Sequence, residues 1–170
     1  MAMNDKVVKK VSLEPYASRH QDELNYELDD VQSLYTVLPS AWFDGTHDGA
    51  GDVAVNRVAI MYDERAVGFF VLDGGDDKYN YTDNPKALLL RSMSLNPAYQ
   101  GLGLSALALT GLARFCQSHV KQADSYNQIV LGVNHDNIAA QKVYEKVGFA
   151  RVERTFMGRS GVQYVYELNI

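Results

Sequence analysis

A pair of glycines, Gly101 and Gly103, lies where a mostly apolar stretch ends and a helical pattern begins. Residues 87–95 before them are typical of a strand. After them, apolar side chains recur at i, i+3 and i+4 spacing, which predicts a helix with the stripe Leu104, Leu107, Ala108, Leu112, Phe115 and Cys116. Glycines let the backbone approach a ligand, and the first amides of a helix lack partners within it. Because the helix dipole is positive at that end, the junction predicts a site for phosphate oxygens.

The rest of the chain alternates between strand and helix patterns. Strands are predicted at residues 6–13, 53–62, 66–72, 87–95, 128–133, 149–156 and 163–168. One or two helices are predicted at 18–28 and 28–38, one follows Gly103, and one runs from an N-cap at Asp136 to Gly148. The order βααβββαβαββ predicts an α/β (α+β) fold, a mixed sheet with helices on both faces. No linker or repeat divides the 170 residues, so we expect one domain, 1–170.

The composition narrows the class of function. Hydrophobic residues make up 46% and charged residues 22%, which is enough for a real core. The net charge of -5 argues against a general nucleic-acid binder, which needs a basic face to displace counterions. An acidic balance is compatible with a cationic or amine substrate but does not demonstrate one.

The single cysteine and the chain's hydropathy bear on location. Cys116 excludes an intramolecular disulfide, which suits a reducing compartment, and its place on the apolar stripe favours a core thiol over a nucleophile. Residues 1–10 contain no apolar signal core. No apolar run approaches the roughly 20 residues that a membrane span needs. We therefore expect a cytoplasmic protein without a membrane partner.

One alternative is a dinucleotide site, because residues 101–106 fit G-x-G-x-x-G/A. That fingerprint normally turns directly from strand to helix, whereas here several residues separate Leu95 from Gly101. The motif also lies late in the chain and leaves too few strands for a doubly wound domain. We therefore disfavour this alternative.

A second segment, residues 133–149, strengthens the argument. Ala140, Tyr144 and Val147 fall on one face of its predicted helix, at i, i+4 and i+7. Taken alone, Tyr144 would be interpreted as an amphipathic core tyrosine, just as the glycines alone could form an ordinary turn. The two segments gain meaning as a pair.

Together the segments resemble the GNAT superfamily of acyl-CoA N-acyltransferases. The family's pyrophosphate motif, Q/R-x-x-G-x-G/A, is matched at Gln100, Gly103 and Ser105, with serine where glycine or alanine is usual. The later motif, roughly N-x-x-A-x-x-x-Y-x-x-x-G-F, is matched at Asn137, Ala140, Tyr144, Gly148 and Phe149. The resemblance covers residues 87–156 at motif level and implies a mostly antiparallel central sheet.

The resemblance implies acetyl-CoA as cosubstrate and direct attack of an amine on the thioester. Two central strands would splay to admit the cofactor. The implied cofactor-binding residues are Met93, Ser94, Leu95, Gln100, Gly101, Leu102, Gly103, Leu104, Ser105, Ala106, Asn137 and Ala140. The strand residues would pair with the pantetheine arm through their backbone, as in β-augmentation. Tyr144 would be the catalytic residue.

Two proton transfers accompany such a reaction. Freeing an amine of pKa about 10.4 at pH 7 costs on the order of 4–5 kcal/mol, so a base or desolvation is needed. The carboxylates that could serve are Glu14, Glu27, Asp30, Asp73 and Asp83. Full proton transfer from an unperturbed Tyr144 to a thiolate is uphill by roughly 2 kcal/mol. A strong hydrogen bond from Tyr144 to the developing thiolate is therefore the better description.

The acceptor is the least constrained part. A primary amine of a small molecule or a peptide is expected, and residues 156–159 faintly resemble bacterial polyamine acetyltransferases. The alternative is a non-catalytic acyl-CoA-binding or sensor protein on the same fold, and the sequence leaves open whether a homodimer forms. Two aromatic pairs either line the acceptor pocket or pack: Trp42 and Phe43, and Tyr79 and Tyr81.

No metal is expected. The acidic residues of one loop, Asp44, Asp48 and Asp52, lack EF-hand spacing. The four histidines show no metal-ligand spacing.

Overall fold

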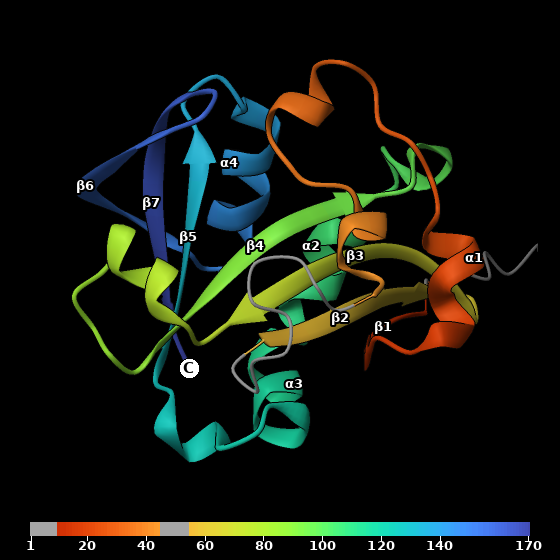
Figure 1. Ribbon diagram of the computed structural model, residues 1–170, viewed down its shortest axis with the longest axis horizontal. Coiled ribbons are helices and arrows are strands. Elements are labelled where there is room, and N and C mark those ends of the chain that lie inside the picture. Colours follow the sequence, from red (N-terminus) through yellow and green to blue (C-terminus); the bar gives the residue numbers. More distant parts are fainter. Residues whose placement is uncertain (1–9, 45–54) are drawn as a thin grey trace, which may run out of the picture.

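A seven-stranded sheet forms the centre of the computed structural model, which describes residues 10–44 and 55–170 (Figure 1). Its strands are β1 (Val11–Pro15), β2 (Val55–Tyr62), β3 (Arg65–Asp73), β4 (Ala87–Leu95), β5 (Gln128–Asn134), β6 (Ala150–Gly158) and β7 (Gly161–Asn169). They lie in the order β1-β2-β3-β4-β5-β7-β6. Among the described pairs, β4 and β5 are parallel and the others antiparallel. The predicted mixed, mostly antiparallel sheet is confirmed.

The parallel pair follows from its connection. A parallel neighbour requires a crossover, and the crossover from β4 to β5 contains α2 (Leu104–Thr110) and α3 (Leu112–His119). The sequence pattern predicted one helix here, but Gly111 separates the two. Its amide bonds to the carbonyl of Ala108, three residues back, which ends α2 in a tighter turn.

Helices cover both faces of the sheet, as predicted. On β2, Val58 and Ile60 belong to the core shared with α2, α3 and α4 (Ile138–Lys146). The alternate residues Ala59 and Met61 belong to a second core with Leu24 of α1 (Gln21–Leu24). This alternation is what a strand buried on both faces requires. Figure 1 shows α2 and α3 behind the sheet and α1 in front.

The helix predicted at 18–28 is shorter than expected, and the one predicted at 28–38 does not form. The structure has the single turn of α1 and 3₁₀ turns at Ser18–His20, Gln32–Leu34 and Pro39–Trp42. Residues 25–38, which we call the strap, do not bury an apolar stripe, since the side chains of Val31 and Leu34 are 59% and 56% exposed. A short segment without a packed face gains too little to hold a helix.

Some sequence predictions fall partly or wholly outside the described residues. They are the starts of the predicted strands at 6–9 and 53–54, and the loop residues Asp48 and Asp52.

Candidate active site

The two parallel strands separate soon after they begin. Pairing joins residues 87–89 of β4 to residues 128–130 of β5, and further along the strands diverge (Figure 1). The opening leads into a cleft of about 900 Å³. Residues 89–95 line it from β4 and residues 132–134 from β5, while the strap, α4 and the β6–β7 hairpin supply further walls.

A bulge in β4 determines which side chains face this cleft. Arg91 and Ser94 of β4 pair with Val71 and Phe69 of β3, so β4 has one residue more than β3 between these two pairs. Within this stretch, Ser92 has a φ of 55°. Such a backbone is strained for a residue with a side chain, and a bulge re-aims the side chains beyond it. Leu88 and Leu90 contact the α2–α4 core before the bulge, whereas Met93 and Leu95 do so after it. The extra residue thus brings Met93 to the side of α4.

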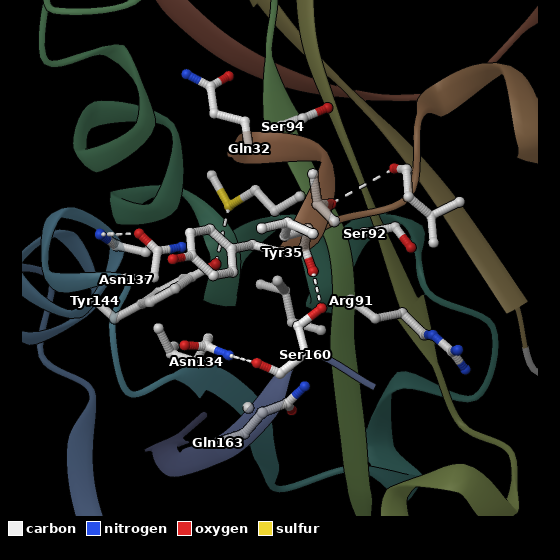
Figure 2. Close-up of a pocket in the computed structure, with 18 of the residues that line it drawn as sticks. Gln32, Tyr35, Arg91, Ser92, Ser94, Asn134, Asn137, Tyr144, Ser160 and Gln163 are labelled. Carbon is white, nitrogen blue, oxygen red and sulfur yellow. Dashed lines mark hydrogen bonds between the residues drawn. The ribbon is translucent and has the colours of Figure 1, made fainter. Parts of the chain in front are cut away.

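Tyr144 of α4 meets Met93 there. Its hydroxyl donates to the Met93 Sδ at 3.5 Å, and its ring lies edge-on to Phe149 at 5.5 Å between centroids (Figure 2). The side chain is 8% exposed. Burial raises the pKa of Tyr144 above its usual value, so the hydroxyl stays protonated at neutral pH. Tyr144 is therefore a persistent hydrogen-bond donor and a poor source of a transferred proton.

The glycine loop, residues 96–103, leads from β4 into α2. Gly101 and Gly103 have φ values of 78° and 75°, in the left-handed region that glycine tolerates. A Cβ at either position would meet no atom within 4 Å, so backbone conformation is the reason for glycine here. The amide of Leu107 bonds to the carbonyl of Gly103, so the three helical amides before it precede the first intrahelical bond.

The side chain of Gln100 is held by hydrogen bonds within the protein. It forms a reciprocal amide pair with Gln32 of the strap, with both N–H···O distances 3.0 Å, and its Nε2 also donates to the Leu95 carbonyl at 3.0 Å. Gln100 thus connects the glycine loop to both β4 and the strap.

The predicted cofactor residues fall into two groups. Those that line the cleft, together with Tyr144, are Met93, Ser94, Leu95, Gln100, Ser105, Asn137 and Ala140. Those outside its lining are Gly101, Leu102, Gly103, Leu104 and Ala106. The side chains of Leu104 and Ala106 are buried at the start of α2, whereas residues 101–103 are exposed. For this second group the predicted contribution is the backbone amide.

The start of α4 corrects the predicted cap. Asn137, rather than Asp136, caps the helix, because its side chain accepts from the Ala140 amide at 3.3 Å. Gln141 reaches back to the carbonyls of Asn134 and His135 at 3.2 and 3.0 Å. These bonds fasten α4 to the end of β5, and the sequence pattern did not reveal them.

None of the five carboxylates predicted as bases is among the residues that line the cleft. Its carboxylates, within the described chain, are Asp77 and Asp136. Arg91 pairs with Asp77 at 2.8 Å and with the buried Asp73 at 3.3 Å. Asp136 has a 71% exposed side chain 3.0 Å from His135.

The aromatic candidates divide as well. Trp42 is fully buried, and Phe43 stacks on Tyr16 at 5.6 Å, so both pack rather than line the cleft. Tyr81 lines it, whereas Tyr79 does not. Sequence reasoning missed several polar residues that line the cleft: Tyr35 of the strap, Ser160 and Gln163 of the hairpin, and Asp77. Isolated polar residues in such segments carry no periodic signal.

In the part of the chain that the structure describes, no cluster of three or more His, Cys, Asp or Glu side chains could hold a metal ion. Within the same residues, no helix combines the length and apolar character needed to cross a bilayer.

Comparison with known proteins identifies the family. The model described as "Acetyltransferase (GNAT) family" matches residues 14–149. The chain belongs to the GNAT acetyltransferase family. It is also 32% identical over 161 residues to the uncharacterized N-acetyltransferase YbbJ of Bacillus subtilis, covering 94% of this chain and 97% of YbbJ.

Solved structures share the GNAT fold. The aminoglycoside acetyltransferase AAC(6')-Ib in complex with coenzyme A superimposes with a TM-score of 0.70 at 16% identity, covering 94% of this chain and 95% of that one. An uncharacterized protein from Bacillus halodurans gives 0.73 at 15% identity, with 95% and 84% covered. The mixed sheet and this likeness exclude a doubly wound dinucleotide fold.

Proposed function

We propose that the protein transfers an acetyl group from acetyl-CoA to a primary amine of a small molecule or peptide, in a ternary complex. The observation that carries the proposal is the Tyr144 hydroxyl, placed beside the bulge of β4 in the cleft between the splayed strands. Membership in an acetyltransferase family supports it independently.

The reaction forms one bond and breaks another. The neutral amine attacks the thioester carbonyl, the C–N bond forms, the C–S bond breaks, and the amine's proton is balanced by the one that the CoA thiolate takes up. Tyr144 would donate a hydrogen bond to the sulfur as negative charge develops there. In the free protein this hydroxyl already points at a sulfur, that of Met93, which is a weak acceptor. A thiolate accepts more strongly and would displace it.

The chain's own groups fit the two ends of acetyl-CoA. The backbone of residues 93–95 follows the bulge at the cleft wall, where the pantetheine amides would pair with it as an added strand. The pyrophosphate would lie on the amides of residues 102–106, beyond the left-handed Gly101 and Gly103. Asn137 and Ala140 would contact the arm from α4.

The test is acetyl transfer to a panel of amines that spans polyamines, amino acids, peptide N-termini and aminoglycosides. Free thiol is followed continuously, and the gain of one acetyl group on the amine is confirmed by mass. A reaction without amine controls for hydrolysis. Amine-dependent thiol release is expected. Tight CoA binding with no acetylated product would instead support the non-catalytic acyl-CoA-binding alternative.

A further inference from the structure

The cleft has an end remote from the glycine loop, formed by the β6–β7 hairpin. Figure 2 shows Gln163 and Ser160 on the side of the pocket opposite Gln32 and Ser94. Since Gln32 contacts the glycine loop through Gln100, the hairpin end lies away from the proposed pyrophosphate position. This far end is where the acceptor's groups other than the reacting amine would be read.

The side-chain amide of Gln163 occupies the space that two glycines leave open. A Cβ on Gly132 of β5 would collide with its Oε1, and a Cβ on Gly158 of β6 would collide with its Nε2. The Cβ on Gly132 would also collide with the ring of Tyr81. These two glycines therefore permit Gln163 to lie across the sheet, in one orientation, at the cleft wall.

Tyr81 determines which end of the amide is available. Its hydroxyl donates to the Gln163 Oε1 at 3.1 Å, and its ring packs on Phe156 at 5.1 Å. Burial raises the pKa of Tyr81, so this hydroxyl remains a donor. Gln163 lines the cleft, and its Nε2 has no acceptor among the described residues, so its N–H groups remain available to a ligand.

A cation from the same hairpin also lines the cleft. Arg159, in the turn between β6 and β7, lines the cleft and forms no ion pair or hydrogen bond in the described part of the chain. It differs from Arg91, whose charge is engaged by Asp73 and Asp77. No carboxylate of the described chain pairs with Arg159; the lining carboxylate near the hairpin, Asp136, lies against His135, whose amide bonds to the Val162 carbonyl.

The charges of the whole cleft are balanced rather than acidic. The described lining contains Asp77 and Asp136 against Arg91 and Arg159. A polycationic acceptor such as a polyamine calls for an excess of one sign along the cleft, which is not present. An acceptor that has both an amine and an anion matches this arrangement.

We propose that Arg159 and Gln163 form a subsite for a carboxylate, so that the acceptor is an amine that also carries a carboxylate, as in an amino acid or a short peptide. The subsite rests on the acetyltransferase function proposed above. A guanidinium and an amide N–H are the donors that pair well with a planar carboxylate.

The experiment compares matched amines that differ in the carboxylate alone: lysine with 1,5-diaminopentane, and β-alanine with ethylamine, with the amino-acid amides as a neutral third arm. Wild type should show a kcat/KM about 10- to 100-fold higher for the carboxylate member, the scale of a hydrogen-bonded charge. Equal rates, or faster acetylation of the members without a carboxylate, would overturn the subsite.

Variants then locate the effect. Arg159→Gln should remove most of the preference through KM, by weakening the carboxylate members far more than the matched amines. Gln163→Glu keeps the acceptor for Tyr81 but replaces the donor with an anion, so the preference should reverse toward those amines. Arg154→Gln is the matched control, because Arg154 belongs to the same hairpin, on β6, but pairs with Asp83 outside the cleft lining.

If Arg159→Gln and Arg154→Gln behave alike, the carboxylate is not read at this end and the subsite is refuted while the enzyme stands. If no amine of any arm releases thiol, the proposed transferase function fails, and the subsite fails with it. Thermal unfolding of each variant checks that the fold is intact, which is expected for the exposed Arg159.

Discussion

The glycine loop and the strap form two adjacent walls of the same site, but they acquire their shapes differently. The loop is shaped by its own residues: Asn96 accepts from the Ala98 amide at 3.0 Å, and Gly101 and Gly103 adopt left-handed conformations. The strap is shaped by residues distant in sequence. The Tyr26 hydroxyl bonds to Ser94 at 2.7 Å. Two further hydrogen bonds hold the strap: Gln32 pairs with Gln100, and the Ser160 hydroxyl donates to the Leu34 carbonyl. Local determinants can be read from a sequence, whereas distant ones cannot.

The largest effect on activity is expected from a change at Tyr144, and the effects of changes in the two walls should be smaller. Tyr144→Phe keeps the ring and its burial but removes the donor, so single-turnover acetyl transfer should fall on the order of 10- to 1000-fold. The KM for acetyl-CoA should change little, and stability by only about 1 kcal/mol. Because burial raises the pKa of Tyr144, its titration should not limit the rate at neutral pH. A single-turnover rate within about twofold of wild type would leave Tyr144 as a packing residue.

A locally determined loop should be sensitive at its own glycines. Gly103→Val places a β-branched residue at a φ of 75°, a conformation strained for it, so the loop should shift and CoA should bind about 10- to 100-fold more weakly by calorimetry. Gly111→Ala is the control, because its backbone is not left-handed and the new Cβ would make only a 3.5 Å contact with the Ala108 carbonyl. Unchanged affinity in Gly103→Val would remove the loop from the phosphate site.

Because the strap is joined to the glycine loop by the Gln32–Gln100 pair, a change in the strap should weaken CoA binding at the loop. Gln32→Ala removes the reciprocal amide pair and should weaken CoA binding by about 2- to 10-fold, since each such bond contributes about 1 kcal/mol. Combining it with Gln100→Ala should cost less than the sum of the two single changes. Ser33→Ala is the control, because Ser33 is also in the strap but its hydroxyl bonds to a nearby strap residue, at the Leu28 carbonyl. Strict additivity would show that the two walls act independently.

The smallest effect concerns the strap's attachment to β4. Tyr26→Phe leaves the hydroxyl of Ser94, a 9% exposed residue, without its partner and should lower the free energy of unfolding by about 1 kcal/mol. Tyr79→Phe, at a 43% exposed position, should lower it by less than about 0.5 kcal/mol. Urea unfolding measures both. Equal stabilities would mean that the strap is not held by this bond.

The same contrast explains how much the sequence revealed. Strand alternation and the α4 stripe predicted the sheet, its helices and the place of Tyr144, because those patterns repeat along the chain. Of the helices expected within 18–38 only the single turn of α1 forms, since the strap is held by hydrogen bonds to residues far away in sequence. The Ser92 bulge, which brings Met93 to Tyr144, depends on pairing with β3 and has no signature of its own. The acceptor end was hidden for the same reason: Gln163 is oriented by Tyr81 and Gly132, from other elements.

A crystal structure of the protein with bound CoA would show directly whether the cleft between the splayed strands is the cofactor site. We predict the pantetheine arm between β4 and β5 beyond Leu89 and Val130, its sulfur within hydrogen-bonding distance of the Tyr144 hydroxyl, and the pyrophosphate on the amides that follow Gly101. The Met93 sulfur would no longer be that hydroxyl's acceptor. CoA seated outside this cleft, or with its sulfur far from Tyr144, would contradict the proposed site.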